Sequence, residues 1–454
     1  MSASFWAPWA WLQGAWQAKV LLRADDAGRW AEVVPGVPLP ADAEPLPGPV
    51  LPALVNAHSH AFQRAFVGLA ERRDSAHDDF WSWRDRMYGV ALRITPAELR
   101  AVAEHLYGEL LAGGYTHTCE FHYLHHAPDS SPYADPLAMS RALAEAAMAT
   151  GMGLTLLPVL YERSGFMQPA LRDEQRRFAT QVQSVLGMRD AIRGWQLPRV
   201  SAGVAVHSLR AARPDSLHEL ARALHGDVGP VHIHVAEQTA EVDDCLAATG
   251  ARPIEWLASQ GLLDARWQLV HATHATPQEI SAVAASGAGV VLCPGTEANL
   301  GDGLCNLPGW LAAGVPLALG SDSHVTRSWP EELRWLEYGQ RLQQRRRNVA
   351  AAPGEQPATA ARLFERMRAG SAAAAGCLHW GLQAGASADL LVLDTHDPGL
   401  AGLPTERLLD ATVFAAAQRP LGRTLAGGRW VGGDAALVAS SARFVTAMHG
   451  LWPR

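Results

Sequence analysis

Short apolar runs alternate with helical patterns through the middle of the chain, from about residue 50 to residue 324. This alternation predicts parallel strands joined by crossover helices, because a parallel strand needs a long connection back to the same edge. Eight apolar runs are present, at residues 50–60, 116–123, 154–161, 203–210, 230–237, 267–274, 289–297 and 316–324. We therefore predict a (β/α)8 TIM barrel.

Two of the connecting segments have clear helix boundaries. Residues 97–114 have an amphipathic pattern that ends at Gly113 and Gly114, as glycine commonly ends helices. Residues 135–151 begin with Asp135, a predicted N-cap, followed by proline at the first helical position. A long polar and aromatic insertion, residues 71–88, follows the first strand, where a barrel would place a substrate loop.

The two ends of the chain have a different pattern from the middle. Residues 16–34 predict a hairpin around the turn DDAG, and residues 389–394 and 424–431 predict further strands without helices between them. We expect these strands to form a small β-sandwich built from both chain termini. The predicted domains are 1–49 and 381–454 for the two parts of this small β domain, and 50–380 for the barrel.

Composition excludes several classes of protein. The net charge of −7 offers no basic stripe for nucleic acid, and about 18 uninterrupted apolar residues, enough to span a membrane, occur nowhere. The N-terminus is rich in tryptophan but has no charge before Lys19, so it lacks the basic start of a secretory signal. Five cysteines without C-x-x-C spacing suit a reducing compartment. We expect a cytoplasmic, soluble protein.

Histidines and one aspartate mark the carboxyl ends of the predicted strands. His58 and His60 end the first strand, where alternation places residues two apart on one face and aims both imidazoles inward. An H-x-H pair alone is a weak sign of metal, but His234 and His271 end strands five and six and Asp322 ends strand eight. Barrel enzymes keep their active groups at this rim. We predict a metal ion on His58, His60, His234 and Asp322.

The predicted ligand set is typical of a catalytic metal. Three imidazoles and one carboxylate leave a coordination position for water, and the metal lowers the pKa of that water from about 15.7 toward about 7. The resulting hydroxide is the predicted nucleophile. Glu237, three residues after His234, is the predicted proton donor to the leaving group. We assign His271 to stabilising the attacked group by a hydrogen bond, and Asp322 to general base catalysis.

Other assignments at the rim depend on single residues. His232 shares a strand face with His234, and we choose His234 because it lies nearer the carboxyl end. Lys19, the only lysine, precedes the barrel, so it cannot supply the carboxylated barrel lysine that bridges two metals in many related hydrolases. One metal ion is therefore favoured, although Glu120 remains a carboxylate that can bridge a second. His274 either supports the site or forms ordinary hydrogen bonds, and the same holds for His324.

Several longer motifs carry a resemblance to a known family. They are NAHSHAFQRAFVGLAERR, DDFWSWRDRMY, EFHYLHH, VAVHSLRA, HIHVAEQTAEVDDC and TEANLGDG. Over nearly its whole length the chain resembles the formimidoylglutamate deiminases of the amidohydrolase superfamily. The resemblance implies hydrolysis of N-formimidoyl-L-glutamate to N-formyl-L-glutamate and ammonia in bacterial histidine degradation, with metal-bound hydroxide attacking the formimidoyl carbon.

A substrate with two carboxylates and an amidine suits the cations near the rim. Arg84 in the insertion and Arg210 after strand four are candidate carboxylate clamps, because guanidinium groups bind carboxylates bidentately. The ordinary alternatives are a solvated loop charge for Arg84 and a salt bridge at the rim for Arg210. Gln63, Tyr123 and His207 match positions that the similar family uses to bind substrate.

The residues leave other functions open. The ligand set cannot distinguish an open amidine from a cyclic one, so the chain is alternatively a deaminase of a nucleobase or another cyclic amidine. A binding barrel with a structural metal is a third reading. We expect one divalent ion, zinc rather than ferrous iron, although both accept these ligands. The resemblance implies a homodimer, in which the tryptophan-rich N-terminus either forms an interface or packs inside the small β domain.

Overall fold

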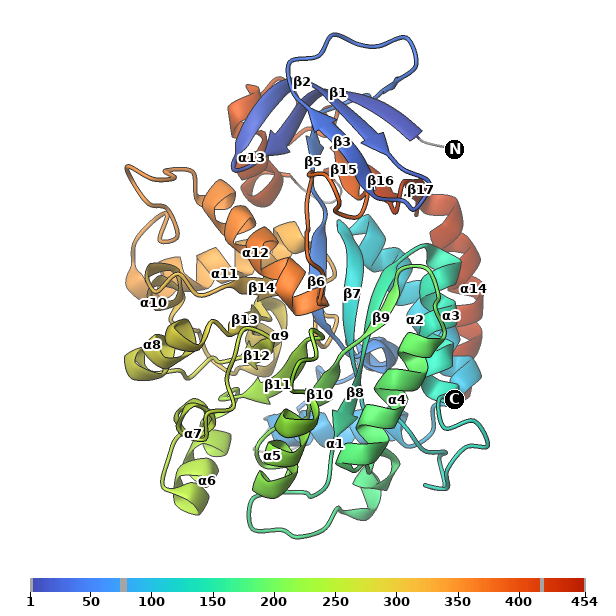
Figure 1. Ribbon diagram of the computed structural model, residues 1–454, viewed down its shortest axis with the longest axis vertical. Helices are drawn as coiled ribbons and strands as arrows, with labels where there is room; N and C mark the ends of the chain where they lie inside the picture. Colours follow the sequence, from blue (N-terminus) through green and yellow to red (C-terminus); the bar gives the residue numbers. More distant parts are fainter. Residues whose placement is uncertain (1–2, 74–79, 417–419, 453–454) are drawn as a thin grey trace.

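Eight strand positions close into a barrel at the centre of the molecule (Figure 1). The computed structural model describes residues 3–73, 80–416 and 420–452. The barrel strands are β6 (Leu54–Ser59), β7 (Tyr115–His122), β8 (Gly153–Leu160), β9 (Val200–Ala202), β10 (Val204–Val206), β11 (Val231–Val235), β12 (Trp267–His271), β13 (Gly289–Leu292) and β14 (Leu317–Leu319). The short strands β9 and β10 share the fourth position, and pairing of β10 with β8 closes the ring. The predicted (β/α)8 barrel is confirmed.

The run predicted as the first strand is divided between two sheets. Val50 and Leu51 form β5, which pairs with strands of the small sheet, and the barrel strand β6 begins at Leu54. Pro52 stands between them, and a strand ladder cannot continue through proline because it has no N–H to donate. The strand that carries His58 is therefore anchored directly in the small sheet.

Helices surround the barrel. They are α1 (Phe80–Ala91), α2 (Pro96–Ala112), α3 (Ala138–Thr150), α4 (Val182–Gly194), α5 (Pro214–Ala223), α6 (Thr239–Thr249), α7 (Pro253–Ser259), α8 (Pro277–Ser286), α9 (Pro294–Leu300), α10 (Leu307–Ala312), α11 (Trp329–Gln344) and α12 (Thr359–Ala375), with 3-10 turns η1 (Ala61–Phe66) and η2 (Asp173–Phe178). A capping box of Thr95 and Glu98 starts α2, and Gly113 ends it as predicted. The N-cap prediction for α3 is wrong, because Asp135 accepts a hydrogen bond from the Leu137 N–H in the turn before the helix.

The predicted substrate loop is partly helical. Of residues 71–88, residues 74–79 lie outside the described part of the chain, and α1 occupies the remainder from Phe80 onward. In Figure 1, α1 lies near the carboxyl ends of the barrel strands, at the end of the molecule away from the small sheet. The insertion therefore brings a helix to the rim of the barrel.

The C-terminal end of α12 closes the bottom of the barrel. The Ala374 carbonyl is 2.9 Å from Nε2 of His232 on β11 and accepts a hydrogen bond from the Cys119 thiol on β7. The next carbonyl, of Ala375, accepts a hydrogen bond of 2.9 Å from Thr155 on β8. Helix C-termini have unpaired carbonyls, and these strand side chains satisfy them. His232 is thereby directed away from the rim.

Strands from both ends of the chain form the small sheet, as predicted. They are β1 (Ala3–Leu12), β2 (Ala15–Ala24), β3 (Trp30–Val34), β4 (Glu44–Pro45), β5 (Val50–Leu51), β15 (Leu390–Leu393), β16 (Leu421–Ala426) and β17 (Arg429–Val431), hydrogen-bonded as a single sheet. The Phe5 ring on β1 contacts Trp430 on β17 with a centroid distance of 5.6 Å, although three strands separate them. The sheet therefore curls until its two halves face each other across a common core, in the manner of a sandwich.

The last part of the chain also contains helices that sequence patterns did not predict. These are η3 (Thr405–Arg407), α13 (Leu408–Phe414) and α14 (Asp434–Leu451). Helix α14 runs beside α2 of the barrel (Figure 1), where Phe444 stacks on the His105 ring at a centroid distance of 4.5 Å. Across the described ranges, the helices are all too short or too polar to cross a membrane.

Candidate active site

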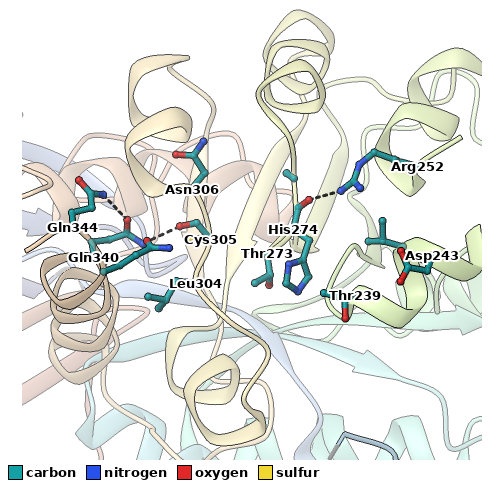
Figure 2. Close-up of a pocket in the computed structure, with 13 residues that line it drawn as sticks. Thr239, Asp243, Arg252, Thr273, His274, Leu304, Cys305, Asn306, Gln340 and Gln344 are labelled. Atoms are coloured by element: carbon teal, nitrogen blue, oxygen red, sulfur yellow. Dashed lines mark hydrogen bonds between the residues drawn. The ribbon is translucent and has the colours of Figure 1, made fainter. Parts of the chain in front are cut away.

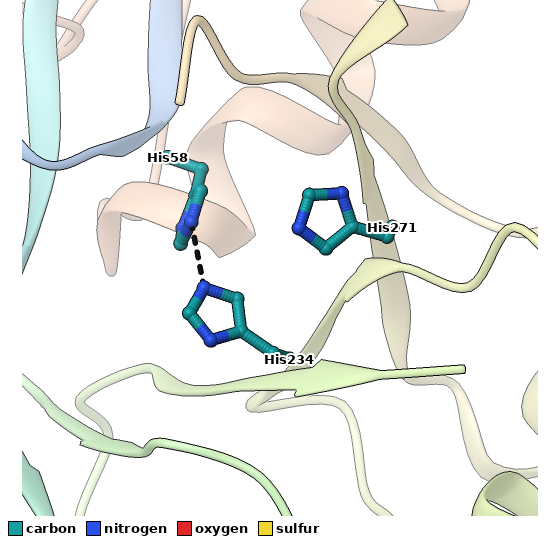
Figure 3. A group of neighbouring side chains, drawn as sticks. All are labelled: His58, His234 and His271. Atoms are coloured by element: carbon teal, nitrogen blue, oxygen red, sulfur yellow. Dashed lines mark hydrogen bonds between the residues drawn. The ribbon is translucent and has the colours of Figure 1, made fainter. Parts of the chain in front are cut away.

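The four side chains predicted to bind metal meet at the carboxyl end of the barrel. His58 on β6 and His234 on β11 face each other with their Nε2 atoms 2.9 Å apart (Figure 3). Oδ1 of Asp322, which follows β14, is 3.5 Å from Nε2 of His58 and 3.4 Å from Nε2 of His60. Three separate strands thus direct three imidazoles and one carboxylate toward a common centre.

The backbone around this centre departs from regular strand geometry. His271 has φ of 69° and Asp322 has φ of 46°, in the left-handed region that residues other than glycine rarely adopt. A hydrogen bond of 3.0 Å from the Asp322 N–H to the His58 carbonyl holds the turn after β14 against β6. Nδ1 of His60 lies 2.9 Å from the Phe121 carbonyl, which orients that ring. Backbone contacts therefore fix the positions of the candidate ligands.

The protonation of these groups suits a cation. Burial lowers the pKa of His58 to about 3, despite the opposing contact with Asp322, and burial likewise lowers the pKa of His60 and His234. Burial would raise the pKa of Asp322, but the His58 hydrogen bond and the surrounding imidazoles lower it. Neutral imidazoles and an ionised carboxylate are the forms that bind metal. This buried set therefore fits one divalent ion, with a coordination position left for water.

Glu237 and His271 lie beside this centre. Nε2 of His271 is 3.7 Å from Oε1 of Glu237 and 3.8 Å from Oδ2 of Asp322. Burial raises the pKa of Glu237 to about 7, although the charge of His271 opposes the rise. Burial would lower the pKa of His271, but the Glu237 charge outweighs it and raises that pKa well above its ordinary value. Glu237 can therefore both accept and release a proton near neutral pH.

One cavity contains all the residues predicted to bind substrate. Gln63, Arg84, Tyr123, His207 and Arg210 line it together with His60, His234, Glu237, His271 and Asp322. The structure also adds residues that were not singled out from the sequence. Trp83, Met87 and Tyr88 belong to the predicted substrate loop, Tyr161 follows the strand β8, and Phe178 and Leu300 come from η2 and α9. Most of these are aromatic or apolar, and only tertiary packing brings them to the cavity.

The two arginines of the cavity come from different elements. Arg84 on α1 lies over the Tyr88 ring, 5.8 Å from its centroid, and burial lowers its pKa, to which the nearby charge of Arg210 also contributes. Arg210 follows β10 and lines the same cavity. Nε2 of Gln63 donates a hydrogen bond of 3.4 Å to the Tyr123 hydroxyl. Two guanidinium groups close enough to repel each other suit an anionic ligand.

Two other polar groups near the rim have structural contacts. Nδ1 of His324 is 2.9 Å from the Ser321 hydroxyl, so its ring is part of the turn before Asp322. The Glu120 carboxylate accepts hydrogen bonds from the hydroxyls of Ser59 and Tyr107. These contacts place Glu120 between β6 and α2 rather than among the candidate ligands.

The closed barrel carries imidazoles, an aspartate and a neighbouring glutamate at its rim. This arrangement is typical of barrel hydrolases that act with a bound metal. A comparison with known protein families agrees with this class. Residues 50–431 match the model of the Amidohydrolase family, and the chain belongs to the amidohydrolase family.

Similar proteins include enzymes of known reaction and solved structures. The chain is 45% identical over 432 residues to the formimidoylglutamate deiminase of Pseudomonas aeruginosa, covering 95% of this chain and 94% of that relative. Among solved structures, an amidohydrolase from Brucella melitensis superposes with a TM-score of 0.92 at 40% identity, over 99% of both chains. An adenosine deaminase from Xanthomonas campestris with bound zinc superposes with a TM-score of 0.79 at 20% identity, over 98% of both chains.

Proposed function

We propose that this protein hydrolyses N-formimidoyl-L-glutamate to N-formyl-L-glutamate and ammonia. The observation that carries the proposal is the joining of two features in one cavity, a cluster of candidate metal ligands and the guanidinium groups of Arg84 and Arg210. The amidine of the substrate would react at the metal ligands, and its two carboxylates would bind the two guanidinium groups. The 45% identity to a formimidoylglutamate deiminase over almost the entire chain supports the same assignment.

We propose that His58, His60, His234 and Asp322 hold one divalent cation, zinc in preference to ferrous iron. The three neutral imidazoles and the ionised carboxylate support this choice, and so does the zinc in the structurally similar adenosine deaminase. When bound, such an ion lowers the pKa of a coordinated water and makes it a nucleophile at neutral pH.

The side chains around the ion then carry the protons. Oδ1 of Asp322 lies 3.5 Å from Nε2 of His58 and 3.4 Å from Nε2 of His60. We assign Asp322 to accept a proton from the attacking water. Addition to the formimidoyl carbon gives a tetrahedral carbon with a nitrogen that must be protonated before it leaves. Glu237, with its pKa near 7, delivers that proton, and His271 donates a hydrogen bond to the developing oxygen substituent. Asp322 also passes its proton on to the nitrogen, and the hydroxyl proton of the intermediate returns to Glu237 as the C–N bond breaks. The nitrogen thus gains two protons and the water loses two, and both side chains return to their starting states.

Substrate orientation follows from the other polar residues of the cavity. We assign the two substrate carboxylates to Arg84 and Arg210, and hydrogen bonds along the chain of the substrate to Gln63, Tyr123 and His207. Charged hydrogen bonds from a guanidinium fork are strong and directional, so they place the amidine at the metal side. An amidinium cation is also attracted to the Glu237 carboxylate beside it.

A second candidate function is deamination of a nucleobase. The ligand set accepts a cyclic amidine equally well, but two arginines in the cavity favour a dianionic substrate. The deciding experiment measures ammonia release from N-formimidoyl-L-glutamate beside cytosine, guanine and adenosine, on protein whose metal content has been determined. A preference for any base would favour the second function, and no hydrolysis at full metal occupancy would point to a binding barrel.

We also propose a cytoplasmic homodimer, with residues 50–380 as the catalytic barrel between the two parts of the small β domain, 1–49 and 381–454. The resemblance to the deiminases supports the dimer. At the N-terminus, the rings of Trp11 and Trp16 contact at a centroid distance of 5.3 Å, and Trp11 donates a hydrogen bond to Glu365 on α12, so this pair packs between the small sheet and the barrel. Sedimentation equilibrium tests the dimer, and a single monomeric species would contradict it.

A further inference from the structure

The loop after α9 separates the active-site cavity from a second pocket at the surface. Leu300 at the end of α9 lines the active-site cavity, whereas Leu304 and Cys305 line the outer pocket. Figure 2 shows that His274 points into the outer pocket from the side opposite Leu304. Asp302 lies in the middle of this loop and is only 5% exposed. A single turn of chain, centred on this aspartate, therefore lies between the two spaces.

Asp302 has no role in the mechanism above, yet its carboxyl group is buried next to that machinery. Oδ1 accepts a hydrogen bond from the side-chain amide of Gln238, the residue after Glu237. Oδ2 is buried and has no hydrogen-bond partner within the described residues. Nor does any arginine in those ranges form an ion pair with it, unlike other buried acids such as Asp389. A buried carboxylate without a cation is costly, and a neutral carboxyl with one accepted hydrogen bond costs much less.

The surroundings of Asp302 favour its neutral form. Burial raises its pKa to about 9, and the negative charge of Glu237 adds to this effect. Three other titratable groups face it. His271 on β12 opposes the rise, Glu297 on α9 adds to it, and the His274 ring lies against the backbone of Asp302. The amide of Gln238 also favours the carboxylate, but less than burial disfavours it. At neutral pH Asp302 therefore carries a proton, while Glu237 is near its midpoint.

The chain segment that Asp302 contacts is the turn that positions Glu237. Ala236 has φ of 51°, a left-handed conformation that other contacts must maintain. On one side, the Glu241 carboxylate accepts hydrogen bonds from the N–H groups of Ala236 and Glu237. On the other side, Asp302 accepts the hydrogen bond from Gln238. The turn is thus held between two buried carboxyl groups.

We propose that Asp302 is a positioning residue for the deimination: as a neutral carboxyl it fixes Gln238, and through it the turn that presents Glu237 to the substrate. This inference rests on the proposed function. Ionisation of Asp302 would place a second negative charge beside Glu237, which makes Glu237 hold its proton more tightly and slows proton delivery to the leaving nitrogen. The rate should therefore fall as Asp302 loses its proton.

The test compares kcat against pH, with N-formimidoyl-L-glutamate as substrate, for four forms of the full-length, zinc-loaded protein. In the wild type we expect kcat to fall above about pH 9. In Asp302→Asn, a neutral group of the same shape, that fall disappears and kcat at pH 7 stays within about fivefold of wild type. In Gln238→Met the hydrogen bond that favours the carboxylate is lost, so the fall moves to higher pH. Asp243→Asn, an exposed carboxylate at the outer pocket, is the matched control and keeps the wild-type profile.

Zinc content and the thermal unfolding midpoint are measured for each form, so that loss of fold is recognised. The same fall above pH 9 in Asp302→Asn would overturn the inference. So would an inactive but folded, zinc-loaded Asp302→Asn, because it would mean that a carboxylate is required. If Asp302→Asn does not fold, the Gln238→Met variant is the test. A fall of kcat at the wild-type pH, or at a lower pH, in Gln238→Met would then overturn the inference. A wild type that releases no ammonia from this substrate refutes the proposed function instead.

Discussion

Replacing Glu237 with glutamine tests the proton transfer most directly. Glutamine keeps the size of the side chain but can neither accept nor release a proton. At pH 7 about half of Glu237 is protonated, since its pKa is about 7, whereas a glutamate with the ordinary pKa of 4.5 would be only about 0.3% protonated. Glu237 can thus begin as the carboxylate that binds the amidinium and later carry the proton that the leaving nitrogen needs. We expect Glu237→Gln to lower kcat by about 10² to 10⁴.

The assay follows ammonia release at saturating N-formimidoyl-L-glutamate, with zinc content measured on the same preparation. Zinc should be retained, because Glu237 is not among the proposed ligands. The matched control is Glu255→Gln, the same change at an exposed glutamate of α7 that does not line the cavity. We expect less than about tenfold change in kcat for this control. A Glu237→Gln enzyme with near-normal turnover and full zinc would show that another group carries the proton.

The pH dependence gives an independent check on Glu237. If the ionised carboxylate binds the amidinium, kcat/KM falls as the pH drops below about 7, where Glu237 becomes protonated. Burial raises the pKa of Glu237, so the carboxylate already takes up a proton as the pH falls through about 7. The activity that depends on the carboxylate is therefore lost below that pH. The residual activity of Glu237→Gln should lack this break, and a break retained at the same pH would assign it to a different group.

Three further outcomes follow from the same geometry. His234→Asn should lower zinc affinity at least about tenfold, measured by competition with a chelator, and zinc retained at wild-type affinity would remove His234 from the ligand set. Arg210→Met should raise KM by about 10- to 150-fold through loss of charged hydrogen bonds, with Arg210→Lys intermediate; an unchanged KM in steady-state kinetics would contradict this. Asp389→Asn should lower the free energy of unfolding by about 3 kcal/mol in urea titrations, because it leaves Arg199 without its partner. The KM should stay unchanged, and a variant as stable as the wild type would contradict this prediction.

Sequence patterns predicted the barrel because its strands are buried on both faces and therefore form continuous apolar runs. The same rule located the rim, since each candidate ligand stands at the end of such a run. Strand boundaries were less predictable. Pro52 interrupts the first run, and the fourth position consists of β9 and β10, with the segment that holds His207 and Arg210 already beyond the strand.

Features that depend on distant packing could not be predicted in this way. Phe178 reaches the cavity only because η2 folds back against the strands, where its ring contacts Tyr161 at the end of β8. Helix α14 has no special sequence signal, yet Phe444 packs on His105 of α2. Asp302 lies within the motif TEANLGDG, but only the three-dimensional contact with Gln238 distinguishes it from a solvated loop acid.

The small sheet and α12 contact the ends of the barrel strands that lie opposite the active site. Strand β5 belongs to the small sheet and is separated from β6, which carries His58, by only two residues. Arg199 and Asp389 form a bidentate pair between the barrel and β15, and Asp389 also accepts a hydrogen bond of 2.7 Å from Thr116 on β7. These contacts fix the lower ends of β7 and of the fourth strand position, and the end of α12 binds side chains of β7, β8 and β11 from the same side. The left-handed turns of His271 and Asp322 follow other strands, β12 and β14, and are held at the rim itself, where the Asp322 N–H donates a hydrogen bond to the His58 carbonyl. The rim therefore depends on contacts at both ends of the barrel.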